Sequence, residues 1–281
     1  MKPYKRVGAT RHTAAFTLVE IALSLAVIGF ALVAIIGILP TGMNVQKENR
    51  EETIINFDSA FLMDAIRSGT RGQDDLTNYI IVVTNWTYQY DNKGRFLNRS
   101  LSFYTSTNYQ VQPNALQTRC FLTNGFNIVG LLSTPKYIYL PSGGYLSNYV
   151  TADFRGISGP VVEQGTNQAS KDFAFRYRLT PEIVPDVEYD GSWTNYTASL
   201  LSPTDVTARS NYMTVQAALR HNLNQVRLRF NWPVLPNGRT GNGRQVFRTV
   251  MSGSIYTNAA VNRFDPFLYF IQSKLYDGQG Q

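Results

Sequence analysis

The fold is decided by the stretch FTLVEIALSLAVIGFALVAIIGILP, residues 16–40. No residue from Ile21 to Leu39 is charged, and as a helix this run would be about 28 Å long, close to the thickness of a bilayer core. It is longer than the apolar region of a typical signal peptide, and no Ala-x-Ala cleavage site follows it. The stretch therefore predicts a membrane-spanning helix over residues 16–39.

The charges on the two sides of this run differ. Lys2, Lys5, Arg6 and Arg11 precede it without an acidic residue, whereas residues 47–52 carry both signs. The positive-inside rule therefore places residues 1–15 in the cytoplasm and the C-terminal bulk of the chain across the membrane. Without those four residues the formal net charge falls from +7 to +3. The excess charge thus belongs mostly to the leader, and nucleic-acid binding is not expected.

One carboxylate stands near the start of the apolar run. Glu20 would cost a few kcal/mol to bury in lipid unless it were paired. Two explanations are open from the residues alone: Glu20 remains wet at the lipid interface, or a cationic partner neutralises it.

The order of these features resembles a known family. Phe16-Thr17-Leu18-Val19-Glu20, after a short basic leader and before an apolar helix, is similar to the processing signal of type IV prepilins and of type II secretion pseudopilins. The resemblance implies that a prepilin peptidase cuts between Ala15 and Phe16 and methylates the new amine. In this family the residue before the cut is nearly always Gly, where this chain has Ala15.

The resemblance also gives Glu20 a role in assembly. As the fifth residue after the cut, it would neutralise the N-terminal amine of a neighbouring subunit. Phe16 and Glu20 are one helical turn apart, so pairing within one chain is the alternative.

The function implied by the resemblance is structural, not enzymatic. The chain would be a minor pilin or pseudopilin of a type IV pilus or type II secretion system, because its head is large for a major subunit. Its partners would be prepilin peptidase, other pilin or pseudopilin subunits and the inner-membrane assembly platform, without a cofactor. It would lie in the bacterial inner membrane with a periplasmic head, and after assembly in a pilus or pseudopilus.

Helical patterning resumes beyond Pro40-Thr41-Gly42, where a kink or local break of the helix is expected. Apolar residues then recur at spacings of three and four and predict one buried face, made by Ile54, Phe57, Phe61, Leu62 and Ile66. Ser68-Gly69 ends the pattern, so one long helix is predicted over residues 16–69.

In residues 70–281, turn-forming residues separate β-rich runs, a pattern typical of an antiparallel β domain, which we call the head. A turn at Asp91–Gly94 lies between two β-rich runs and predicts a hairpin. Residues 226–232 alternate apolar and polar side chains, and a second strand is expected at 245–251 after a loop over 233–243. Residues 113–170, rich in Gly, Pro, Ser and Asn, predict long loops with short strands. The predicted fold class is α+β, pilin-like, with a long helix packed on an antiparallel sheet.

Two patterns in the head have alternative interpretations. The first is the run of arginines on the predicted strands, interpreted as a solvated face and not an anion site: Arg227, Arg229, Arg239, Arg244 and Arg248. The second is Asp186-x-Glu188-x-Asp190-Gly191, which matches the first half of an EF-hand loop. Its twelfth position is Thr197 and no flanking helices are evident, so an acidic turn is favoured over calcium binding by Asp186, Glu188 and Asp190.

Two rival functions are open. An uncleaved, membrane-tethered head could bind glycans or surface ligands through its many Tyr and Trp residues, and it would keep residues 1–15. A tethered hydrolase would depend on His221, because His12, the other histidine, lies in the leader. No CxxC, HExxH, GxSxG or Walker pattern occurs, and the single cysteine, Cys120, excludes an intrachain disulfide.

Overall fold

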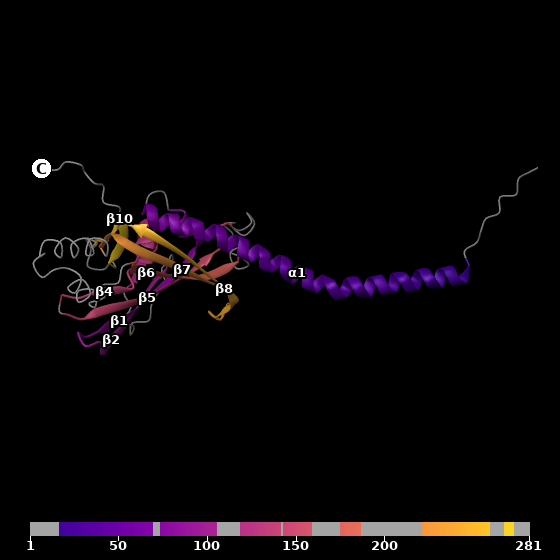
Figure 1. Ribbon diagram of the computed structural model, residues 1–281, viewed down its shortest axis with the longest axis horizontal. Helices are drawn as coiled ribbons and strands as arrows, with labels where there is room; N and C mark the ends of the chain where they lie inside the picture. The colour runs from indigo at the N-terminus through magenta and orange to yellow at the C-terminus, as the bar shows by residue number, and fades with distance from the viewer. Residues whose placement is uncertain are drawn as a thin grey trace, which may run out of the picture. The chain divides into compact units, whose positions relative to one another are not determined.

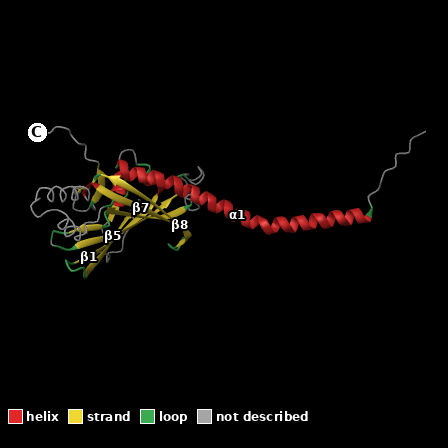
Figure 2. Ribbon diagram, in the orientation of Figure 1, coloured by secondary structure: helices red, strands yellow, loops and turns green. Residues whose placement is uncertain are grey.

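The computed structural model describes residues 17–69, 74–105, 119–141, 143–158, 175–186, 221–258 and 267–272. They form three helices, α1 (Leu18–Ser68), α2 (Leu76–Tyr79) and α3 (Gly125–Leu132), together with strands that belong to two sheets (Figures 1 and 2). The chain divides into two compact units, residues 1–52 and 53–281, which are considered separately.

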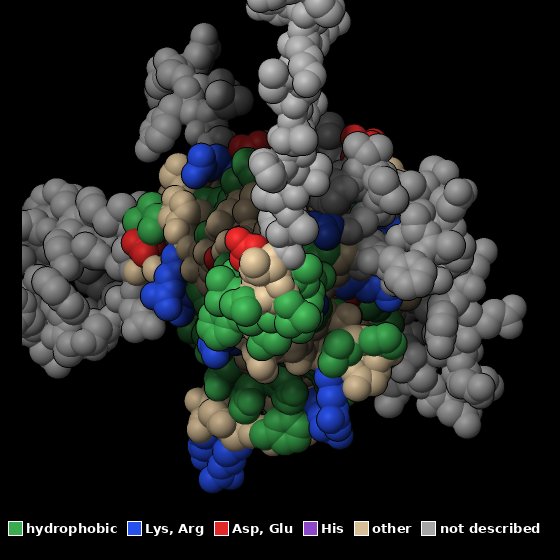
Figure 3. Space-filling view, turned by 90° about the vertical axis from the view of Figure 1, so that its right-hand side faces the viewer, with side chains coloured by type: hydrophobic (Ala, Val, Ile, Leu, Met, Phe, Trp, Pro, Cys, Tyr) green, Lys and Arg blue, Asp and Glu red, His purple; other side chains and the backbone are tan. Residues whose placement is uncertain are grey.

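The first unit contains the apolar part of α1. The helix is continuous through Pro40, so of the two alternatives expected at residues 40–42 the local break does not occur, and the kink stays a prediction. Side chains from Thr17 to Arg50 are all exposed, and hydrophobic ones dominate the surface that the helix presents to the viewer in Figure 3. By length and composition α1 is able to cross a membrane, as an anchor or as a signal sequence.

The second unit is built on one large sheet with the strand order β3-β2-β1-β5-β6-β7-β8. These strands are β1 (Ile80–Tyr90), β2 (Phe96–Thr105), β3 (Arg119–Phe121), β5 (Tyr145–Arg155), β6 (Arg176–Pro185), β7 (Leu223–Val234) and β8 (Thr240–Ser252), and β4 (Tyr137–Tyr139) also pairs with β5. All pairs are antiparallel except β2 with β3. A second sheet pairs β9 (Ser254–Asn258) with β10 (Leu268–Gln272). The α+β architecture predicted from the sequence is therefore confirmed.

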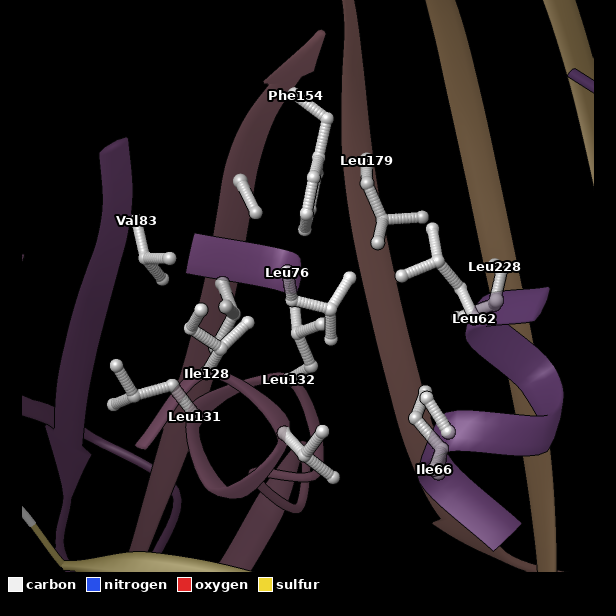
Figure 4. Packing of buried hydrophobic residues seen from close by; sticks show 14 of the residues in the cluster. Leu62, Ile66, Leu76, Val83, Ile128, Leu131, Leu132, Phe154, Leu179 and Leu228 are labelled. Atoms are coloured by element: carbon white, nitrogen blue, oxygen red, sulfur yellow. The ribbon is translucent and has the colours of Figure 1, made fainter. Parts of the chain in front are cut away.

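The core lies between one face of the large sheet and the last turns of α1, together with α3 (Figure 4). From the helix, Leu62 and Ile66 are fully buried, and Leu179 and Leu228 come from strands β6 and β7. We call the face of the sheet toward α1 the inner face, and its opposite the outer face. Along β7, inner residues alternate with half-buried outer ones, as the sequence pattern predicts.

The buried face of α1 differs from the predicted one. Ile54, Leu62 and Ile66 are buried, but Phe57 is 64% exposed and Phe61 is also exposed. Asp58 and Ser59 are buried in their place. Spacing alone made the two phenylalanines equivalent to their aliphatic neighbours, whereas the geometry of the sheet selects a face rotated toward Ile55, Asp58 and Ser59.

Both predicted hairpins are present. The β1–β2 turn spans Asp91–Arg95, and the Asp91 side chain accepts hydrogen bonds from the amides of Lys93 and Arg95, both at 2.8 Å. The β7–β8 connection is shorter than predicted, because the strands extend to Val234 and restart at Thr240.

The prediction of long loops over residues 113–170 is wrong in part. This range contains the helix α3 and the eleven-residue strand β5. The side chain of Asn124 caps α3 by accepting from the amide of Asn127 at 2.9 Å. Gly130 is needed within α3, since a Cβ there would lie 2.8 Å from Leu268 Cβ and Phe270 Cζ. The glycine content of this range, which predicted a loop, instead reflects a helix in which Gly130 permits the close approach of β10.

Candidate functional site

The first candidate site is the start of α1, where Thr17 and Glu20 bond to each other. The Thr17 amide donates to Glu20 Oε2 at 2.9 Å, and the Glu20 amide donates to Thr17 Oγ1 at 3.3 Å. The Thr17 hydroxyl also donates to Glu20 Oε2 at 3.0 Å. This reciprocal pattern is a capping box, in which each side chain satisfies a backbone amide that the helix leaves free.

The capping box gives the Glu20 carboxylate a partner within its own chain. Thr17 is the residue before the helix, its carbonyl accepts from the Ile21 amide at 3.2 Å, and the Ser24 hydroxyl donates to the Glu20 carbonyl at 2.7 Å. Glu20 is exposed in the isolated chain, so it remains accessible to a further cation. The spacing Thr-x-x-Glu is the sequence signal for such a box, whereas the expectation for Glu20 rested on its charge alone.

The predicted processing residues, Ala15 and Phe16, lie outside the described residues. Pairing between a Phe16 amine and Glu20 therefore stays a prediction. In the structure Thr17, the residue after Phe16, donates two hydrogen bonds to Glu20 Oε2, one from its amide and one from its hydroxyl.

No protein-family model, curated protein or solved structure matches this chain.

A second charged group, Asp58, is fully buried in the head and was not expected from the sequence. Its Oδ2 accepts from the Ile157 amide at 2.8 Å, and its Oδ1 accepts from the Ser158 amide at 2.9 Å and from the Ser158 hydroxyl. Burial raises the pKa of Asp58, and hydrogen bonding, first from the Ser158 hydroxyl and then from the Ile157 and Ser158 amides, opposes that rise. Burial and the nearby Asp58 carboxyl also raise the pKa of the Tyr177 phenol well above its usual value.

The arrangement around Asp58 fits an anchor more closely than a catalytic group. Its acceptors are occupied by a loop of the same chain, which ties residues 157 and 158 to α1. Within the described ranges, no three His, Cys, Asp or Glu side chains gather as a metal site would require.

The other residues singled out from the sequence are not brought together. Asp186 is exposed at the end of β6, while Glu188 and Asp190 lie outside the described residues, so the calcium hypothesis stays untested. His221 is exposed just before β7. Cys120 is in β3, and its side chain is not among those described.

The arginines of β7 and β8 lie on the outer face, as predicted. Arg227 donates to Gln225 Oε1 at 2.8 Å, and Arg229 lies 4.0 Å from Glu182. Arg244 and Arg248 of β8 are exposed, and so is Arg239, which lies in the connection between the two strands. Exposure of three arginines and the contacts of Arg227 and Arg229 with Gln225 and Glu182 agree with the solvated-face interpretation, although Arg229 Nε is buried without a hydrogen-bond partner among the described residues.

Proposed function

We propose that this chain is a pilin-like structural subunit, a minor pilin or pseudopilin of a type IV pilus or type II secretion system. The observation that carries the proposal is one continuous helix. It begins beside the FTLVE motif, is exposed and apolar along its first turns, and ends in the core of a β-rich head. A subunit that inserts its helix into a filament needs both an exposed apolar stretch for its neighbours and a firm attachment to the head.

The capping box supports this proposal through its position. Cleavage between Ala15 and Phe16 would leave the Thr17 amide and hydroxyl in place, so the helix start would remain capped in the mature subunit. One Glu20 oxygen serves the box in the described structure, and the Oε1 atom remains for the amine of a neighbouring subunit. Membrane storage before assembly would use the same apolar stretch as an anchor, with the head in the periplasm.

The deciding experiment is the intact mass and N-terminal sequence of the chain purified from its own cells. The proposal expects a chain that begins at N-methylated Phe16. A matched Ala15→Gly variant restores the residue usual before the cut, and it is expected to be processed at least as completely. Both forms should remain unprocessed in cells without prepilin peptidase.

An unprocessed chain that begins at Met1 in normal cells would contradict the proposal. It would favour the second candidate, a membrane-tethered binding module that keeps its anchor. The exposed aromatic residues on the outer face of the sheet, described next, are the observation that supports this candidate.

A further inference from the structure

The outer face of the sheet carries an unusual concentration of tyrosines near the β1–β2 hairpin. Residues directly opposite each other on antiparallel strands lie on the same face. The register aligns Tyr90 with Tyr145 and Tyr145 with Tyr139 in one row, and Tyr88 with Ser147 and Ser147 with Tyr137 in the next. A third row aligns Trp86 with Tyr149. We call the six tyrosines the tyrosine face: Tyr88, Tyr90, Tyr137, Tyr139, Tyr145 and Tyr149.

Ring contacts join four of these tyrosines directly. Tyr90 stacks on Tyr145 with centroids 4.8 Å apart, and Tyr137 and Tyr139 both lie against Tyr145, at 6.1 and 6.4 Å. Phe96 of β2 extends the surface beyond Tyr90 at 6.1 Å.

The tyrosine face is not part of the core. Tyr139 is 68% exposed, Phe96 is 55% exposed, and none of the six tyrosines is buried. The inner face of the same strands is mixed: Asn85 and Thr87 lie opposite Val150 and Asn148, and Val150 is buried in the core. In an ordinary half-buried sheet the aromatic residues would point inward. Here hydrophobic burial does not explain their position, so a surface role is indicated.

The charge around this surface is positive. Lys93, Arg95 and Arg99 lie on the β1–β2 hairpin against one acid, Asp91, whose Oδ1 accepts two backbone amides of the turn, so the hairpin carries a net positive charge. Arg99 lies 5.7 Å from the centre of the Trp86 ring, at the border of the tyrosine face. On the β4 side the single cation, Lys136, is paired with Glu182 at 3.0 Å. Of the described cations beside the tyrosine face, those that make no ion pair with an acid therefore lie on the hairpin side.

We propose that the tyrosine face binds an anionic polysaccharide. The C–H faces of sugar rings pack on exposed aromatic rings, and the phenol hydroxyls and Ser147 supply hydrogen-bond partners for sugar hydroxyls. The hairpin cations supply the charge complementarity for carboxylates. A nucleic acid fits less well, because its binding grooves place cations along the whole backbone path, and here the β4 and β5 side has none unpaired among the described residues.

The test is titration of the full chain, in detergent micelles, with alginate, a polymer of uronic acids. Binding is followed by calorimetry. The double variant Tyr137→Ala/Tyr139→Ala is expected to weaken binding about tenfold, since each lost ring contact contributes part of the affinity. Tyr256→Ala is the matched control, because Tyr256 is 52% exposed on β9, outside the tyrosine face, and its loss should leave binding unchanged. Far-UV circular dichroism checks that each variant is folded.

A second pair of variants tests the charge. Arg95→Gln/Arg99→Gln should weaken alginate binding several-fold at low salt and less at high salt. Arg244→Gln/Arg248→Gln removes two exposed cations of β8 and should have little effect.

Any one of four results would overturn the inference, and three of them concern alginate and dextran. These three are the absence of alginate binding, equally tight alginate binding by Tyr137→Ala/Tyr139→Ala and by the control Tyr256→Ala, and binding to neutral dextran as tight as to alginate. Tighter binding to single-stranded poly(dT) than to alginate would also overturn it and would assign the face to nucleic acid. These outcomes are independent of the proposed pilin-like role, because N-terminal processing is measured separately.

Discussion

At the scale of single residues, Asp58 is the buried polar side chain of the head whose substitution we expect to lower stability. Replacing it with Asn presents an amide N–H₂ to backbone and hydroxyl donors, so at least one buried hydrogen bond is lost. We expect the free energy of unfolding of Asp58→Asn to fall by about 1–3 kcal/mol in a urea titration. Asp64→Asn, on an exposed part of the same helix, should change it by less than about 0.5 kcal/mol. Equal stability of the two variants would remove the anchoring role.

The same carboxyl predicts a pH dependence of stability. Burial raises the folded-state pKa of Asp58 above its usual value of 3.8, so the folded state binds this proton more tightly than the unfolded state. The stabilisation by the protonated form is complete below about pH 4 and is lost as pH rises through the folded-state pKa. Urea midpoints across this range should show the decline in the parent chain and a smaller decline in Asp58→Asn. An identical decline in both would assign it to other groups.

Glu20 allows its charge to be separated from its capping function. Gln at this position keeps an oxygen acceptor for the capping box but loses the negative charge, whereas Ala loses both. If Glu20 neutralises an amine during assembly, both variants should insert into the membrane and both should be depleted from sheared filaments. Thr17→Ala weakens the box and keeps the charge, so its incorporation should remain near normal. Normal incorporation of Glu20→Gln would show that capping, not charge, is what assembly requires.

At the scale of elements, the rotated face of α1 is directly measurable. Leu62 is fully buried and Phe57 is mostly exposed. Leu62→Ala should lower the free energy of unfolding by about 2–5 kcal/mol, because it leaves a cavity against β6 and β7. Phe57→Ala should change it by less than about 0.5 kcal/mol in the same urea titration. The opposite order would mean that the originally predicted face is the buried one.

The elements that the sequence predicted well are those with a strong local signal. Val226, Phe230 and Trp232 alternate with polar residues, and the turn after Tyr90 has Asn, Lys and Gly. The helix α3 lacked such a signal, because its two glycines disfavour a helix locally and only the approach of β10 explains Gly130. Tertiary contacts outweighed propensity there.

Of the candidate functional residues, some could be predicted from the sequence and others could not. Glu20 was identified because a carboxylate in an apolar run is conspicuous, while its bond to Thr17 was visible in the spacing but not considered. Asp58 could not be predicted, because its donors at residues 157 and 158 are about a hundred positions away in sequence. The tyrosine face was foreseen only as a general abundance of Tyr, since strand register decides which rings meet.

At the scale of the whole molecule, the division at Glu52 predicts that the head is independent of the apolar stretch. Every buried hydrophobic residue of the described core lies at or beyond Ile54. A fragment of residues 53–281 should therefore remain soluble without detergent and unfold cooperatively in urea. A fragment that begins at residue 69 lacks Ile55, Leu62 and Ile66, and it should fail to fold. Cooperative unfolding of the shorter fragment would contradict the place given to α1 in the core.

Two tryptophans of the described chain occupy contrasting surroundings, and this makes the protein its own optical reporter. Trp232 is 5% exposed, so its emission should be blue in the folded state and shift to longer wavelength on unfolding. Trp86 is partly exposed beside the Arg99 guanidinium, so its emission should respond to whatever covers the outer face. In a Trp193→Phe background, two wavelengths would then follow the integrity of the head and the occupancy of its surface in the same cuvette, without an attached dye.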